Sequence, residues 1–158
     1  MMYYTHLAFG LLTSIIYLHF FNIDYPPIFV LIAVFFSIFP DIDESRSKIG
    51  RKNKIFSIPI KFVFGHRDIF HTIYVPIILF AIIFNLSETI GIAMIIGYAS
   101  HLLMDALTKH GIRPLSPLIR TRIYGFVKTN SIFEKLFFLL ILALDFYFIT
   151  QYAMNYIL

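Results

Sequence analysis

The sequence predicts an all-α fold, a polytopic bundle of about five membrane-spanning helices that forms one domain over residues 1–158. Hydrophobic residues make up 59% of the chain, and the mean hydropathy is +0.80, whereas soluble domains are ~45–50% apolar. Only 14% of the residues are charged, against about 25% in a soluble domain. A soluble fold of this size lacks the interior to bury so much Ile, Leu and Phe. The apolar residues also gather in five runs.

The first two runs form a predicted helical hairpin. The run Leu7–Ile23 has no Lys or Arg before it and no small-residue cleavage site after it, so we expect a retained helix rather than a signal peptide. A turn with Pro26 and Pro27 follows, and proline is well tolerated at the start of a helix. The second run, Pro26–Phe39, is short for a ~30 Å hydrocarbon core, which needs roughly 20 residues.

A basic stretch separates this hairpin from the next one. Residues Ser45–Lys61 carry six Lys or Arg and are predicted to form a solvated loop, and the mixed segment Ile55–Phe64 is suited to the membrane interface. The third and fourth apolar runs, Ile73–Leu86 and Ile90–Leu107, are joined by a short turn. They predict a second hairpin.

The last part of the chain repeats this alternation of basic and apolar segments. The second basic region runs from Lys109 to Lys135, and Pro114 and Pro117 in it oppose helix formation. The fifth apolar run, Leu136–Leu158, is the longest of the five and contains one charge, Asp145.

The positions of the basic residues predict the membrane topology. All 13 Lys and Arg lie between Arg46 and Lys135, and the turns around Asp24 and Glu88 contain neither residue. Both basic regions flank the same hairpin, so the positive-inside rule puts them in the cytoplasm. We therefore expect a multi-pass protein of the cell membrane with a cytoplasmic N-terminus and the lipid bilayer as its partner.

The same charge pattern argues against another class of partner. The chain lacks the basic tail or aromatic-basic pattern of a nucleic-acid binder, and we expect no nucleic-acid partner. No feature of the sequence sets an oligomeric state.

The ionisable residues converge on the predicted cytoplasmic face. His101 and Asp105 are four residues apart, so on a helix their side chains share one face. A carboxylate near the end of a membrane-spanning helix is costly to bury without a partner. The predicted topology brings further His and Asp residues to the same face from three other helix ends. The complete set of predicted metal ligands is His6, Asp41, Asp43, His66, His71, His101 and Asp105.

This set of side chains predicts a metal centre. The chain contains no cysteine, so any metal is bound by nitrogen and oxygen, which suits zinc, manganese or iron. Seven ligands exceed the ~4 that one zinc ion takes, so we expect one to three ions, with zinc preferred and manganese as the second choice. Arg67, between His66 and His71, could bind a phosphate oxygen or stabilise developing negative charge.

Four short motifs resemble the YdjM family. They are Thr5-His6-x3-Gly10, Pro40-Asp41-x-Asp43, His66-Arg67-x3-His71-Thr72 and Ser100-His101-x3-Asp105-x2-Thr108, followed by Pro114-x2-Pro117. The YdjM family comprises small membrane proteins described as inner-membrane, metal-dependent hydrolases of the LexA-regulated type. The resemblance covers about Thr5 to Arg122 and implies a membrane location and a metal-dependent hydrolase.

The His101–Asp105 spacing is also distantly similar to zinc-dependent phospholipase C and P1-type nucleases. Those all-helical enzymes bind three zinc ions with His and Asp, which implies zinc and phosphoester hydrolysis. One residue departs from the YdjM pattern. Asp68 follows Arg67 where the family usually has glycine, and its carboxylate could neutralise Arg67 and weaken the predicted oxyanion role.

Together these features predict a membrane-bound metal-dependent hydrolase of a phosphoester, with lipid-like esters among the candidate substrates. A metal-activated water would be the nucleophile, and the predicted catalytic residues are Asp43, Arg67 and Asp105. Two alternatives remain open. Intramembrane His and Asp also mark the ion pathway of a metal or proton transporter, and a metal site with four protein ligands could be structural, in a non-catalytic membrane scaffold.

Overall fold

The structure is a computed structural model that describes residues 1–42 and 69–157. The described residues form five α-helices, α1 (Tyr3–Phe20), α2 (Pro26–Phe36), α5 (Tyr74–Leu86), α6 (Glu88–Ala106) and α7 (Ile132–Ile157), and two short 3-10 helices, η1 (Phe39–Ile42) and η2 (Ile69–His71). Two isolated bridges, between Thr108 and Val127 and between Ile112 and Ile123, are the β-type pairings in these ranges. The predicted all-α class is therefore confirmed for the described part of the chain.

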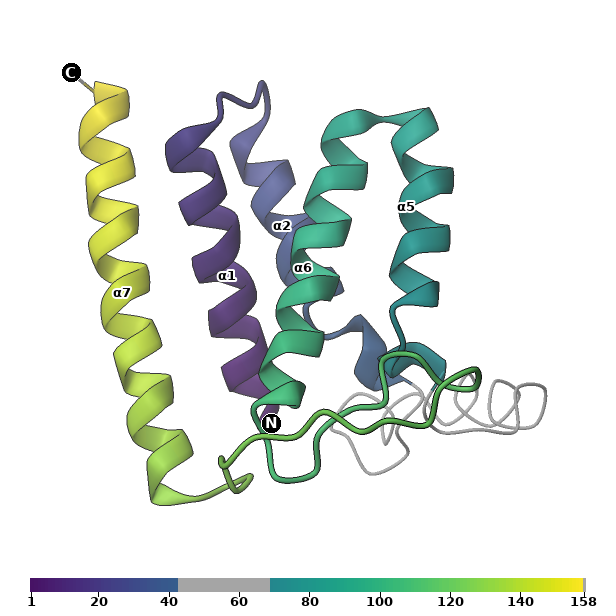
Figure 1. Cartoon of the computed structure of the whole chain (residues 1–158). Coiled ribbons are helices and arrows are strands. Elements are labelled where there is room, and N and C mark those ends of the chain that lie inside the picture. The colour runs from purple at the N-terminus through teal and green to yellow at the C-terminus, as the bar shows by residue number, and fades with distance from the viewer. Residues whose placement is uncertain (43–68, 158) are drawn as a thin grey trace.

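The helices run side by side, with α6 at the centre of the bundle (Figure 1). Helix α6 packs against α1, α2 and α5, and α7 packs mainly against α1. The turn between α1 and α2 and the turn between α5 and α6 lie at one end of the bundle. The N-terminus, η1, η2 and the connection from α6 to α7 lie at the other end, which matches the alternation expected from the sequence.

Capping interactions explain why two helices begin earlier than predicted. The Ser87 hydroxyl accepts a hydrogen bond from the Ile90 amide, at 3.4 Å, and α6 starts at Glu88. The Ser131 hydroxyl accepts one from the Glu134 amide, at 3.2 Å, just before α7 begins. Each serine satisfies an amide that the first helical turn leaves without a partner.

Two glycines lie directly against α2 and the residue that ends it. A Cβ atom on Gly97 of α6 would lie 2.0 Å from the Ala33 carbonyl oxygen of α2, and one on Gly10 of α1 would lie 2.4 Å from the Ser37 Cβ. Small residues at helix contacts let two backbones pack tightly, as is common in membrane bundles. These contacts fix how α1, α2 and α6 meet above the ends that carry His6, Asp41 and His101.

One helix, α6, is both long and apolar enough to cross a membrane, within the ranges that the structure describes. The apolar helices at Pro26–Asp41 and Tyr74–Leu86 are shorter. The number of complete spans therefore stays a prediction. The basic loop Ser45–Lys61 and the interfacial segment Ile55–Phe64 lie outside the described residues.

Replacing Gly97 should destabilise the bundle. The new methyl group of Gly97→Ala would collide with the backbone of α2, and overpacking of this kind costs about 1–3 kcal/mol. The measurement is the thermal unfolding midpoint of the detergent-purified protein. Ala81→Val, at an exposed position of α5, is the control and should unfold like the parent. An unchanged midpoint for Gly97→Ala would contradict the close approach of α2 and α6.

Candidate metal centre

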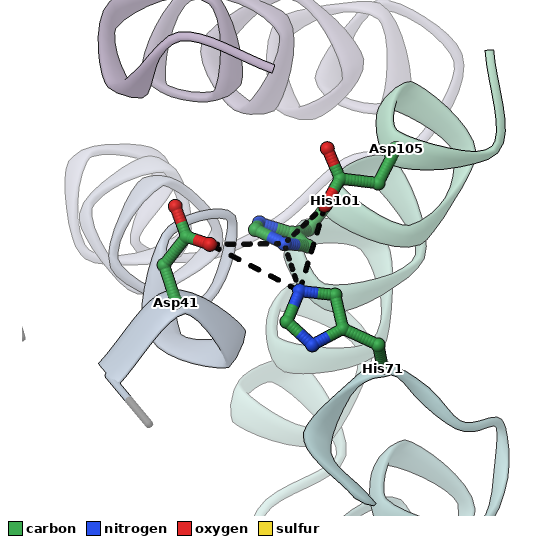
Figure 2. Close-up of side chains that lie close together, drawn as sticks. All are labelled: Asp41, His71, His101 and Asp105. Carbon is green, nitrogen blue, oxygen red and sulfur yellow. Dashed lines mark hydrogen bonds and ion pairs between the residues drawn. The ribbon is translucent and has the colours of Figure 1, made fainter. Parts of the chain in front are cut away.

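Four predicted ligands meet at the end of the bundle beside the N-terminus. One donor atom from each of Asp41, His71, His101 and Asp105 lies within 4.8 Å of the other three. Figure 2 shows these side chains pointing toward one another from η1, η2 and α6. Residues up to 64 positions apart in sequence thus form one cluster of two imidazoles and two carboxylates, a group that could hold a metal ion.

The spacing of the donor atoms fits a tetrahedral ion. The Nε2 atoms of His71 and His101 are 3.3 Å apart. The Asp105 Oδ2 atom lies 3.5 Å from each of them, and the Asp41 Oδ1 atom lies 3.9 Å from each. Zinc bonds of about 2.0–2.1 Å imply tetrahedral edges of about 3.3–3.4 Å. The four side chains could therefore bind one ion with shifts of a few tenths of an ångström.

His101 is oriented by the backbone of α2. Its Nδ1 atom lies 2.7 Å from the Ser37 carbonyl oxygen, and both groups are buried. A carbonyl oxygen only accepts hydrogen bonds, so Nδ1 carries a proton, and in the neutral form of the ring the Nε2 lone pair faces the cluster. Metal-binding histidines are commonly held by such a bond to a carbonyl.

His71 is positioned by contacts on both sides of it in the chain. The Tyr98 hydroxyl donates a hydrogen bond to the Phe70 carbonyl, at 2.7 Å. The Ile73 amide donates one to the Pro114 carbonyl, at 2.9 Å. Helix α6 and the connection after it therefore hold η2 against the cluster.

His6 lies next to the cluster and contacts the opposite side of Asp105. Its ring stacks on His101, with centroids 4.1 Å apart. Its Nε2 atom is 3.2 Å from the Asp105 Oδ1 atom, at an angle outside hydrogen-bond geometry. The Met1 amino group also contacts this oxygen. Asp105 thus faces the cluster through Oδ2 and α1 through Oδ1, and a direct metal-ligand role for His6 stays a prediction.

Asp41 differs from the other cluster residues in its surroundings. It lies in η1 after the end of α2, and 13% of its side-chain surface is exposed. Burial raises the pKa of its carboxyl above the usual value, and the neighbouring His101 opposes this shift. A bound cation would favour the charged carboxylate further.

The remaining predicted site residues cannot be placed with the cluster. Asp43, His66 and Arg67, with Asp68, lie outside the described residues. Their predicted roles as ligands or catalytic groups stay predictions.

Asp145 lies in α7, away from this cluster, and it is 3% exposed. Neither of its carboxylate oxygens has a hydrogen-bond partner among the described residues.

Sequence reasoning missed Glu134, which anchors α1 to α7. The fully buried Glu134 carboxylate accepts hydrogen bonds from the Met2 amide, at 2.6 Å, from the Asn130 amide, at 2.5 Å, and from the Thr5 hydroxyl, at 3.4 Å. It therefore fixes the first turn of α1. This turn contains Thr5, the residue before His6. The spacing Ser131-x-x-Glu134 is a helix-capping pattern that would have marked this residue.

Comparison with known proteins gives the family. The chain matches the family "YdjM inner membrane protein" over residues 1–157. It is 35% identical over 135 residues to the uncharacterized protein YvsG of Bacillus subtilis (strain 168), a match that covers 84% of each chain.

The inner membrane protein YdjM of Escherichia coli (strain K12) is 35% identical over 92 residues, which are 54% of this chain and 47% of that protein. No solved structure matches the chain. The protein belongs to the YdjM family, and the names of its relatives support a membrane location. The distant similarity to phospholipase C and P1-type nucleases finds no support in these comparisons.

Metal content is the direct test of the cluster. The detergent-purified protein, analysed for elements after reconstitution with divalent metal, should contain about one ion per cluster, because four donors complete one tetrahedral site. His101→Ala and Asp105→Asn should each lose most of it. Asp145→Asn removes a buried carboxylate elsewhere and should retain the metal. Equal metal in all four proteins would exclude the cluster as the binding site.

Glu134→Gln should destabilise the protein without changing a metal ligand. The amide group of glutamine would turn a donor toward the Met2 or Asn130 amide, and a buried polar group left unsatisfied costs about 1–3 kcal/mol. The control is Glu88→Gln, at an exposed position in the first turn of α6. The test is the unfolding midpoint of both variants. A midpoint equal to that of the parent in Glu134→Gln would show that this anchor contributes little.

Proposed function

We propose that the protein is a membrane-embedded, metal-dependent hydrolase of phosphoesters. The observation that carries this proposal is the convergence of two imidazole nitrogens and two carboxylate oxygens within 4.8 Å. The cluster is partly accessible, because the side chains of His71, Asp41 and Asp105 are 13%, 13% and 16% exposed. Its residues belong to η1, η2 and the C-terminal part of α6, which lie at one end of the bundle rather than at its middle (Figure 1), where a water-borne group can reach them.

The cluster residues have separate roles in this proposal. A bound divalent ion supplies Lewis acidity toward a phosphoryl oxygen and makes water a better nucleophile at neutral pH. His71 and His101 hold the ion, and the Ser37 carbonyl keeps the His101 lone pair directed at it. Asp105 closes the site through Oδ2, and its other oxygen is held by α1.

Proton transfer and charge neutralisation fall to the residues around the ion. Asp43, two positions after Asp41, is the proposed general base. Arg67 is proposed to neutralise charge on the phosphoryl group, as far as its neighbour Asp68 allows. Zinc is the proposed ion, and manganese is the second choice.

A structural role for the metal is the second candidate, and one observation favours it. Four protein donors already complete a tetrahedron, and structural zinc sites are closed in this way, whereas catalytic sites keep a position for water or substrate. In this case the ion would fasten η1 and η2 to α6. The protein would then be a scaffold that binds metal but has no hydrolytic activity. The transporter alternative has weaker support, because transporter sites usually lie near the middle of the membrane.

Hydrolysis by the metal-loaded protein separates the two candidates. The parent should release nitrophenol from p-nitrophenyl phosphate or bis(p-nitrophenyl) phosphate, and chelation should stop the reaction. His101→Ala should lower kcat/KM by about 100-fold or more, because loss of a ligand disables the ion. Asp145→Asn, which leaves the cluster intact, should retain the parent rate. Stoichiometric metal without hydrolysis, with a lower unfolding midpoint in His101→Ala, would support the scaffold and reject the hydrolase.

A further inference from the structure

An apolar groove runs between α1 and α6 and encloses about 450 Å³, a volume within the ~300–1,000 Å³ typical of ligand pockets. Its walls are mainly aromatic on the α1 side, whereas the α6 side combines the small residues Ala99 and Ser100 with Ile96 and Leu103. It is open along one side, where Ala99 and Leu103 are exposed. The residues that line the groove include Phe9, Thr13, Phe20, Ala99, Ser100 and Leu103.

Two hydroxyl groups that line this groove, those of Thr13 and Ser100, are hydrogen-bonded within their own helices. The Thr13 hydroxyl lies 3.0 Å from the Phe9 carbonyl and 3.1 Å from the Gly10 carbonyl, and donates its proton within α1. The Ser100 hydroxyl donates to the Gly97 carbonyl, at 2.7 Å, within α6. Neither hydroxyl proton is available to a ligand, so an apolar occupant fits this groove better than a polar one.

The length of the groove matches one leaflet of a bilayer. Phe9 and Phe20 are separated by 11 residues of α1, which is about 16 Å at a rise of roughly 1.5 Å per residue. A hydrocarbon core is ~30 Å thick, so one leaflet contributes about 15 Å. An extended acyl chain that enters from one leaflet would occupy the groove along its whole length.

One end of the groove lies at the same end of the bundle as the metal cluster. His6, Phe9 and Thr13 follow one another at positions i, i+3 and i+7, so they lie on the same face of α1. His6 stacks on His101 and approaches Asp105. On α6, Leu103 lies at the level of these two cluster residues along the helix, although its side chain is on a different face. A chain in the groove would therefore place its polar head at the end of the bundle that carries the cluster.

We propose that the α1–α6 groove binds an acyl chain of the substrate, which makes the substrate a lipid phosphate ester. This proposal rests on the proposed hydrolase function for the cleavage step. The groove sets the position of the chain, and the cluster acts on the phosphoester of the headgroup. In the reaction, water adds to phosphorus, the P–O bond to the leaving group breaks, and the leaving oxygen takes a proton. No redox step or further co-reactant is needed.

Substitution of Ala99 tests the groove. Ala99→Phe fills the groove from its exposed side, and Ala81→Phe adds the same ring at an exposed position of α5. The first probe is lysophosphatidic acid with a photoreactive diazirine near the end of its chain, in phosphatidylcholine nanodiscs. Peptides of α1 and α6 should carry the cross-link in the parent and in Ala81→Phe. In Ala99→Phe the yield should fall about tenfold, because the ring occupies the space of the chain and overpacking costs about 1–3 kcal/mol.

Activity measurements separate the groove from the cluster. In Ala99→Phe, the ratio of kcat/KM for lysophosphatidic acid to that for p-nitrophenyl phosphate should fall by a similar factor, whereas Ala81→Phe should keep the ratio of the parent. Equal cross-linking in all three proteins, or cross-links spread evenly over all helices, would mean that the groove holds bulk lipid only and would overturn the proposal. Hydrolysis of no phosphoester by the metal-loaded parent, with groove-specific cross-linking intact, would reject the hydrolase and leave a lipid-binding groove.

Discussion

The carboxylate of Asp105 imposes the main constraint on this structure. It lies at the end of the one described helix that is long and apolar enough to cross a membrane, and an unpaired charge there would be very costly. One carboxylate oxygen contacts the start of α1 through His6 and the Met1 amino group, and the other contacts His71 and His101. The ends of α1 and α6 and the short helix η2 therefore have to meet at one point.

Much of the fold could be predicted from hydropathy and charge. The long apolar runs predicted the five described α-helices, since each run is bounded by prolines, polar turns or basic residues that interrupt a hydrophobic helix. The helix boundaries were less accurate where tertiary contacts decide them. The start of α1 at Tyr3 depends on Glu134, which is 131 residues away in sequence, and no local pattern around Tyr3 indicates it. The number of spans depends on a bilayer and on residues beyond those described.

The sequence indicated which residues form the candidate site, but it did not indicate their contacts with one another. Placing His and Asp at helix ends on one face indicated which side chains could meet, and four of them lie within 4.8 Å. The different contacts of the two Asp105 oxygens were not predictable, because they depend on which oxygen lies nearer to each helix. The role of Ser37 was hidden for a different reason. Its contribution is a backbone carbonyl, and a backbone group leaves no signature in the identity of the side chain.

The use of a backbone carbonyl to orient His101 has a consequence for sequence divergence. The hydrogen bond itself places no demand on the side chain of residue 37, since every amino acid supplies a carbonyl. The demand comes from packing, because the Ser37 side chain faces Gly10 so closely that a Cβ on Gly10 would lie 2.4 Å from the Ser37 Cβ. Positions 10 and 37 are therefore expected to vary together in size across the family. The orientation of His101 can stay the same while the side chains at positions 10 and 37 change.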